Sequence, residues 1–479
     1  MLLIINPVQP THIYTRVNRD KDSKNSLNNK DKIRKFHVFT INSYICTAQK
    51  GFYKMKHPEW SYSAVLYEMN VRQLTSEGTL AAAAEYLPRL KELGIDCIWL
   101  MPIYPIGAEN RKGSEGSYYS ISDYCNINPS FGNFDDFDAF VTAAHNLGLK
   151  VILDWVANHT ARDAKWLQDK PLDWYKRDEN GVAQVPWDWS DTAQLNYDNR
   201  DVWQGQIEAM KFWVERHNID GFRCDMAMLV PIEFWQVVRF SLNQIKPDIF
   251  LLAEAEEDNL FQNAFDACYS WRLHHAMCDV AQGKSRVWTL RDTIHADRHR
   301  FPKWSMRMTF TSNHDENSWS GSEFTRFGAA LEPMAALTFL LPNSLPLLYT
   351  GQEFGYDHSF EFFDHDPMPE FERNRHTDFY TKLCSIYHSH KALHSADKGG
   401  SFIEIDNNAP DCLMTFVRER EDDRVVVIAN LSPYTVFGDF HTGIYAGEYI
   451  DAMTDKQTTL YEHMWGDITP WSYKILIKP

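Results

Sequence analysis

Four short segments of this chain combine an apolar run with a carboxylate at or near its end. They are DWVANHT at 154–160, GFRCD at 221–225, LLAE at 251–254 and FTSNHD at 310–315. In a parallel α/β barrel such runs are buried strands, and the residues at their carboxyl ends line the open top of the barrel. The carboxylates expected to meet there are Asp154, Asp225, Glu254 and Asp315. Like charges repel each other, and glycoside cleavage is one chemistry that needs carboxyl groups gathered in one cleft.

Asp225 and Glu254 are the pair best placed for a retaining mechanism. That mechanism needs two carboxyl groups about 5–5.5 Å apart, one as nucleophile and one as acid and base. The two residues end consecutive strands, and neighbouring strands lie about 4.8 Å apart. Arg223 lies two residues before Asp225 and shares its strand face, so we expect its guanidinium to orient Asp225 and keep it ionised.

The elements that must position these residues follow a regular alternation from about residue 63. Apolar runs that predict strands lie at 64–71, 95–103, 150–156, 219–225, 248–254, 265–271, 304–313 and 345–353. Apolar residues at helical spacing predict helices at 80–94, 134–148 and 201–218. Eight strands with helices between them close a barrel. The predicted fold class is therefore α/β, a (β/α)8 TIM barrel.

Two stretches depart from the barrel pattern. Residues 161–200 are rich in Asp, Trp and Pro, which predicts a short excursion after strand three, inside a catalytic barrel spanning 55–395. After residue 396, short apolar strands alternate with turn residues. This pattern predicts a C-terminal all-β sandwich domain over 396–479.

The first 54 residues form a third region. Residues 1–55 hold ten Lys and Arg against three Asp and Glu, with few apolar side chains to build a core. We expect residues 1–54 to be a disordered basic extension. Two further interpretations stay open, namely upstream sequence read from an early start codon and a nucleic-acid-binding arm.

Composition narrows the partners and the compartment. The formal net charge is −17, whereas nucleic-acid binding needs clustered Lys and Arg, so no nucleic-acid partner is expected. No uninterrupted apolar stretch reaches about 18 residues, and MLLIINP is too short for a secretory signal. We therefore expect no membrane partner and a cytoplasmic location. The eight cysteines form no CxxC pair, which favours reduced thiols, and the soft residues of 268–278 fit a helix better than a zinc site.

The strand-end segments resemble the α-amylase superfamily, glycoside hydrolase family 13. DWVANHT is similar to the family's strand-three motif D-x-x-x-N-H, GFRCD to its strand-four motif G-F-R-x-D, LLAE to strand five and SNHD to strand seven. The resemblance covers about residues 58–479, and four motifs in order at barrel spacing are specific. It implies a retaining hydrolase of α-glucosidic bonds in maltooligosaccharides and α-glucans, acting through a covalent glycosyl-enzyme intermediate.

The resemblance implies a role for each matching residue. Asp225 would be the nucleophile, Glu254 the acid and base, and Asp315 a third carboxylate that holds sugar hydroxyls. GSYYSISDY at 116–124 resembles the segment whose tyrosine stacks under the same sugar, which selects Tyr119. The other substrate-binding residues would be His159, Arg223 and His314, and those with a structural role at the site would be Asp154 and Asn158.

The chain departs from many α-amylases at two positions linked to structural calcium. Met228 and Leu229 occupy the place of a Lys-His pair, and Gln194 stands where an aspartate can ligate the ion. Asn158 alone cannot supply the six to eight oxygens that calcium takes. We therefore predict no metal and no cofactor.

Two other functions remain open at this stage. A transglycosylase or an isomerase of the same family, such as a trehalose-forming enzyme, would use the same intermediate. A catalytically inactive binding subunit is the more remote possibility, and retention of Asp225, Glu254 and Asp315 disfavours it. The sequence leaves α-1,4 against α-1,6 preference, endo or exo action, substrate length and oligomeric state undetermined.

Overall fold

The computed structural model describes residues 55–478, so the expected basic extension over 1–54 lies outside the described residues. Eight parallel strands close a barrel in the order β1-β10-β9-β8-β7-β6-β3-β2. They are β1 (Leu66–Met69), β2 (Cys97–Leu100), β3 (Lys150–Val156), β6 (Gly221–Asp225), β7 (Phe250–Ala253), β8 (Ala267–Tyr269), β9 (Met306–Thr309) and β10 (Ser344–Tyr349). The predicted (β/α)8 TIM barrel is confirmed.

Apolar side chains pointing inward fill this barrel. Trp99, Ile152, Leu252, Tyr269 and Met308 are all at most 1% exposed and belong to one core cluster. Because this interior is filled, functional side chains can gather only where the strands end. Asp225 is the last residue of β6, and Glu254 directly follows β7.

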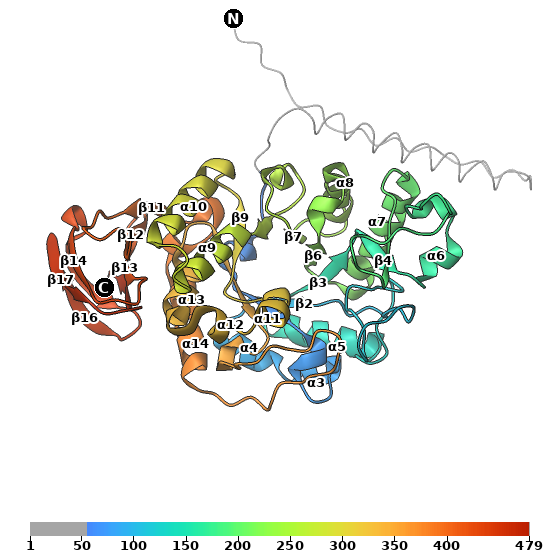
Figure 1. The fold of residues 1–479 in the computed structure, drawn as a ribbon, viewed down its shortest axis with the longest axis horizontal. Coiled ribbons are helices and arrows are strands. Elements are labelled where there is room, and N and C mark those ends of the chain that lie inside the picture. Colours follow the sequence, from blue (N-terminus) through green and yellow to red (C-terminus); the bar gives the residue numbers. More distant parts are fainter. Residues whose placement is uncertain (1–54, 479) are drawn as a thin grey trace, which may run out of the picture. The chain divides into compact units, whose positions relative to one another are not determined.

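Helices surround the barrel strands (Figure 1). They are α2 (Val71–Leu74), α3 (Leu80–Ala84), α4 (Leu87–Leu93), α5 (Phe134–Asn146), α7 (Arg200–His217), α8 (Ile232–Asn243), α9 (Trp271–Ala281), α10 (Val287–Arg300), α11 (His314–Ser320), α12 (Glu323–Phe327), α13 (Leu331–Leu340) and α14 (Arg375–Ser389). The single helix predicted over 80–94 was wrong, because the chain forms α3 and α4 instead. Pro88 cannot donate a backbone hydrogen bond, and it is tolerated only in the first turn of the new helix α4.

The excursion after strand three is small and carries one wall of the site. The two-stranded sheet of β4 (His159–Ala161) and β5 (Thr192–Gln194) encloses the short helix α6 (Lys165–Asp169). In the register of this sheet, His159 lies opposite Gln194. The excursion thus begins at the end of β3 and returns to the same place before α7.

The C-terminal residues form two antiparallel sheets, drawn in orange to red in Figure 1. Six strands pair in the order β11-β12-β13-β18-β15-β16, and β14 pairs with β17. Their bounds are β11 (Ser401–Glu404), β12 (Leu413–Arg420), β13 (Asp423–Asn430), β14 (Val436–His441), β15 (Gly447–Asp451), β16 (Lys456–Leu460), β17 (His463–Ile468) and β18 (Tyr473–Ile477). Phe440 of β14 and Val426 of β13 share one apolar core, which confirms the predicted all-β sandwich.

The sandwich is joined to the barrel helices by buried backbone contacts. The Arg418 guanidinium donates to the Leu340 carbonyl at 2.8 Å, and Arg291 of α10 donates to the Leu413 carbonyl at 2.6 Å. Among residues 55–478, none of the helices is both long enough and apolar enough to span a bilayer.

Candidate active site

One buried arginine organises the strand ends. The Arg223 guanidinium contacts Asp154 at 2.9 Å, Asp225 at 3.2 Å and Glu254 at 3.0 Å. Arg223 Nη1 contacts both aspartates, and Arg223 Nη2 contacts Glu254. Carboxyl groups from neighbouring strands therefore lie against one planar cation. The Tyr269 hydroxyl accepts from Arg223 Nε at 3.1 Å and fixes the plane of the guanidinium. The structure thus brings together three of the four carboxylates predicted to meet.

Asp315 joins this cluster through His314. Both residues begin helix α11, whose N-cap Asn313 accepts from the Glu316 backbone N–H at 2.8 Å. His314 Nε2 lies 3.5 Å from Asp315 and 2.8 Å from the Tyr119 hydroxyl. The short helix therefore turns the end of strand β9 back across the barrel and presents both side chains to the cleft.

Tyr119 connects the two halves of the site. Its hydroxyl donates to Asp154 at 3.1 Å, and its ring stacks on His314 with centroids 5.3 Å apart. Asp154 also accepts from the Trp99 indole N–H at 3.1 Å. With both carboxylate oxygens of Asp154 engaged and its side chain fully buried, this residue anchors Arg223 and Tyr119 and is shielded from a substrate.

His159 lines the opposite wall next to the excursion. The Asn158 amide lies 3.3 Å from His159 Nδ1, and an amide N–H there can only donate, which leaves the imidazole proton on Nε2. Burial lowers the pKa of His159 to about 4, so the ring is neutral at pH 7. His159 can therefore donate one hydrogen bond from Nε2 to a ligand.

The residue after Asp225 adopts an unusual backbone conformation. Met226 has φ of 42°, in the left-handed region that residues with a Cβ seldom adopt. This turn aims the Met226 N–H at Glu254 Oε2, at 2.7 Å. Strain of this kind collects at functional sites, where it positions groups. Here it holds one oxygen of Glu254 and leaves the other to face the cleft.

The electrostatics reflect crowded carboxyl groups. Burial raises the pKa of Asp225 well above its ordinary value, and the nearby Glu254 raises it further, against the opposing effect of Arg223. Burial likewise raises the pKa of Asp154 to about 6, although Arg223 opposes it. The pKa of Asp315 is also raised, by desolvation and by Glu254. Because one guanidinium cannot neutralise all of these groups, the pKa values of Asp225, Asp154 and Asp315 stay raised although Arg223 opposes the shift.

A cavity of about 400 Å³ opens above these residues. Besides the predicted residues, its lining includes Lys112, Ser117, Asp188, Trp189, Asp191, Thr192, Met226, Trp319, Phe362 and Phe363. The aromatic rings form two walls. Trp189 lies on the excursion, with its ring 4.8 Å from that of Trp187, and Trp319 and Phe362 lie 5.3 Å apart on the side of Tyr119. A polar floor between flat apolar walls suits a ligand with hydroxyls at its edge and an apolar face.

Glu68 of β1 is a site residue that the motif analysis missed. It is fully buried, and its carboxylate contacts His314 Nδ1 at 2.5 Å and accepts from the His314 backbone N–H at 3.3 Å. Burial alone would lower the pKa of His314, but Asp315 and Glu68 together raise it to about 9. The signal was present in the sequence, because Glu68 is a carboxylate within the first apolar run.

The positions that the family resemblance links to calcium do not supply a fitting set of oxygens in this chain. Asn158 and Gln194 each offer only one neutral amide oxygen, and Leu229 offers no polar side chain. Within residues 55–478, the group of three or more His, Cys, Asp or Glu side chains with ligand atoms close enough for one ion is Asp439, His441 and His463, in the C-terminal sheets.

An eight-stranded barrel with carboxyl groups gathered around one arginine at the strand ends defines an enzyme of the acid–base type. The chain belongs to the α-amylase family. Residues 12–192 and 174–408 match the α-amylase catalytic domain, and residues 404–468 match the α-amylase C-terminal all-β domain.

Individual relatives agree with this assignment. The α-amylase MalA of Haloarcula japonica is 29% identical over 422 residues, which cover 84% of this chain and 61% of that protein. The chain therefore spans about three fifths of the length of this relative. Trehalose synthase of a Pimelobacter species is 32% identical over 207 residues, covering 36% of this chain and 35% of that protein. The crystal structure of the maltogenic α-amylase AmyB from Thermotoga neapolitana matches with a TM-score of 0.79 at 27% identity, covering 87% of this chain and 99% of that one.

Proposed function

We propose that this protein is a retaining glycoside hydrolase that cleaves α-glucosidic bonds in maltooligosaccharides and related α-glucans. The observation that carries the proposal is the pair Asp225 and Glu254, held on neighbouring strand ends by one guanidinium beneath an aromatic-walled cavity. Neighbouring strands, about 4.8 Å apart, suit the short carboxyl separation of the retaining mechanism. The family assignment and the names of the relatives supply the α-glucan substrate class.

Asp225 is the nucleophile in this proposal. Arg223 holds Oδ1, whereas Oδ2 is buried and has no hydrogen-bond partner within residues 55–478. A carboxylate oxygen of Asp225, which lines the cavity, attacks the anomeric carbon, the bond from that carbon to the glycosidic oxygen breaks, and a glycosyl ester forms.

Glu254 is the acid and then the base. Its Oε2 is occupied by Arg223 and by the Met226 N–H, so proton transfer uses Oε1. The Oε1 proton passes to the leaving glycosidic oxygen. The same oxygen then takes a proton from water, the hydroxide adds to the anomeric carbon, and the ester bond to Asp225 breaks.

The remaining polar residues bind the sugar at the cleavage point. Asp315 accepts hydrogen bonds from ring hydroxyls, while His314 and His159 donate from their Nε2 atoms. Tyr119 supports the apolar face of the ring. Asp154 and Asn158 do not contact the sugar in this proposal. Asp154 positions Arg223, and Asn158 positions His159.

The test is to incubate the protein with maltooligosaccharides of increasing length and with pullulan, and to follow the products and their anomeric configuration by NMR. We expect shorter maltooligosaccharides released first as the α-anomer. Asp225→Asn, which is nearly isosteric, should retain below about a hundredth of wild-type turnover while its melting curve stays unchanged. Release of the β-anomer, or full activity of Asp225→Asn, would refute the proposal.

A transglycosylase or isomerase is the second candidate, and the similarity to a trehalose synthase favours it over a binding subunit. The glycosyl ester on Asp225 can pass to a sugar hydroxyl instead of water. Maltose as sole substrate separates the two: glucose as the product supports hydrolysis, whereas trehalose or longer oligosaccharides support transfer. An inactive binding subunit would produce none of these, and the complete carboxyl cluster argues against it.

The cytoplasm is the location we propose. Seven cysteines among residues 55–478 are free thiols, and secreted proteins usually oxidise such residues to disulfides. Recovery of the native protein in a secreted or periplasmic fraction would contradict this location.

A further inference from the structure

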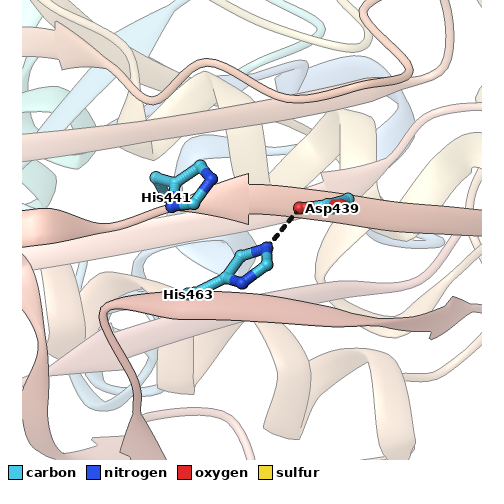
Figure 2. A group of neighbouring side chains, drawn as sticks. All are labelled: Asp439, His441 and His463. Atoms are coloured by element: carbon cyan, nitrogen blue, oxygen red, sulfur yellow. Dashed lines mark hydrogen bonds and ion pairs between the residues drawn. The ribbon is translucent and has the colours of Figure 1, made fainter.

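The sheet of β14 and β17 carries a cluster of ligand-type side chains far from the chemistry described above. His441 and His463 are direct partners in the register of this antiparallel pair. Asp439 lies two residues before His441 and therefore points to the same side of the strand. Figure 2 shows the three side chains together on this face.

The alternation along both strands confirms that this side faces outward. Phe440 and Met464 pack into the sandwich core, whereas the residues between them are the partly or fully exposed Asp439, His441, His463 and Trp465. Two imidazoles and a carboxylate thus meet on a surface with room for an incoming ion and its water.

The distances within the cluster are short. His463 Nε2 lies 2.6 Å from Asp439 Oδ1, and the two imidazole rings are nearly parallel with centroids 4.3 Å apart. One ligand atom from each residue can be chosen so that all lie within 4.8 Å of one another. A tetrahedral zinc ion with bonds of about 2.0–2.1 Å needs ligand atoms about 3.4 Å apart. Rotation of the exposed side chains covers that difference without movement of the strands.

We propose that Asp439, His441 and His463 form a binding site for a divalent transition metal of the zinc class. Two imidazole nitrogens and one carboxylate oxygen are ligands that zinc takes, and water completes the fourth position. Oxygen-rich calcium or magnesium sites look different, because those ions prefer six or more oxygen ligands. Paired strands with ligands at positions i, i+2 and directly across suit a single small ion.

The backbone around the cluster is already held in place. The Asp439 N–H donates to the Asn408 side chain at 2.8 Å, which fixes β14 from its other edge. Beyond His441, the Thr442 hydroxyl donates to the Tyr461 carbonyl at 2.6 Å and the Thr442 N–H to the Glu462 carbonyl at 2.9 Å. Both chains are thus fixed next to the ligands, and an ion would join β14 to β17 at the open end of this sheet.

The simpler interpretation is a surface hydrogen bond between Asp439 and His463 with His441 stacked beside it. The two interpretations differ in what happens when metal is added. A metal that binds only the folded state stabilises it in proportion to the logarithm of its concentration, whereas a surface hydrogen bond does not respond. Protons compete for the same nitrogens, so binding should weaken as the solution is acidified.

The test is equilibrium dialysis of the full chain against zinc at pH 7.5, with the metal content measured, together with the visible spectrum of the cobalt form. We expect one equivalent of zinc, a tetrahedral cobalt spectrum and a melting temperature that rises with zinc. His441→Gln and His463→Gln should each lower the affinity by about 10–100-fold or more. Asp439→Asn should weaken binding, and acidification to pH 5.5 should abolish it.

The matched control is His299→Gln, which alters an exposed histidine of α10 outside the cluster and should bind like wild type. The double variant His441→Gln/His463→Gln measures any zinc held by the carboxyl groups of the cleft. A thermal melting curve recorded in the presence of a chelator shows whether each variant is folded without metal. Zinc content and cobalt spectra that are the same in the double variant as in wild type would overturn the proposal, as would the absence of binding by folded wild-type protein.

Discussion

Glu68→Gln is the substitution that most sharply tests how the site works. Glu68 lies beneath His314 at 2.5 Å from Nδ1 and is not itself part of the cavity lining, so we expect it to act through His314. The change preserves shape and removes one negative charge. It therefore separates the charge of Glu68 from its packing.

The magnitude follows from the pKa of His314. A rise from 6.5 to about 9 corresponds to about 3 kcal/mol favouring the charged imidazole, at ~1.4 kcal/mol per pKa unit. Asp315, 3.5 Å away, and Glu68 share this effect against the cost of burial. Loss of Glu68 should lower the pKa of His314 by at least about one unit, which is a tenfold loss of the charged form above that pKa.

Loss of the positive charge on His314 changes its Nε2 atom from a hydrogen-bond donor to an acceptor. With both nitrogens protonated, His314 donates from Nδ1 to Glu68 and from Nε2 toward Tyr119 and the sugar. In the variant, a neutral ring that still donates from Nδ1 to the new amide carbonyl has a bare Nε2, which can only accept. The sugar then loses one donor, so the variant should lose activity mainly at alkaline pH.

The assay is kcat/KM on a maltooligosaccharide from pH 5.5 to 9.5. We expect the alkaline limb assigned to His314 to move down by at least about one pH unit in Glu68→Gln, with activity reduced about twofold at pH 8, approaching tenfold at pH 9.5, and largely recovered at pH 5.5. Glu68→Asp, which keeps the charge, should restore much of the profile. The control is Glu353→Gln, another buried glutamate, which accepts from Tyr67 and Tyr86 outside the cavity.

The same linkage predicts a stability change with a definite sign. The folded-state pKa of His314 lies above the ordinary value, so its contribution is complete below pH 6.5 and is lost as the pH rises through about 9. Wild type should lose melting temperature across this window more steeply than Glu68→Gln. If the two proteins show the same activity profile and the same melting temperatures from pH 6 to 9, Glu68 does not control the charge of His314.

Three further outcomes follow from the site. Glu254→Gln should lose about 10²–10⁴-fold in kcat on maltooligosaccharides but still transfer glycosyl groups from a fluoride donor, with azide accelerating turnover; absence of azide rescue would show that another group is the acid and base. Trp319→Ala should raise KM about two- to tenfold with little change in kcat, since stacking contributes ~0.5–1.5 kcal/mol to ground state and transition state alike; the control is Trp288→Ala, also an exposed tryptophan but on α10. Calcium added after chelator treatment should change neither kcat nor melting temperature, because Gln194 and Leu229 offer no carboxylate or imidazole; a rise specific to calcium over magnesium would contradict this.

The strand ends could be predicted because their chemistry and their position are local. Asp225 and Glu254 each close a run of buried apolar residues, so the periodicity that identifies the strand also places the carboxyl group at the barrel top. The parallel pairing of β6 with β7 places Cys224 opposite Ala253, so the next residues, Asp225 and Glu254, lie side by side. The charge pairing of Arg223 with Asp225 followed from their spacing of two on one strand.

The walls of the cavity could not be predicted in this way. Phe362 lies in a segment without helix or strand, and Trp319 lies at the end of a short helix. Their positions depend on long-range packing such as the 5.3 Å contact between their rings, which leaves no periodic trace in the sequence. The break between α3 and α4 has a local cause in Pro88, but the prediction of one helix rested on the helical spacing of the apolar residues, which continues across the break.

The charges within the site explain why one missed residue matters. Arg223 and a charged His314 are the cations that face the buried carboxyl groups of Asp154, Asp225 and Glu68, and the cleft adds Glu254 and Asp315. With more acids than cations in a poorly solvated space, protons stay on some of the acids, and the pKa values of Glu68, Asp154, Asp225 and Asp315 all rise. Glu68 limits this excess of negative charge, because it helps to keep His314 protonated and His314 then supplies the second cation.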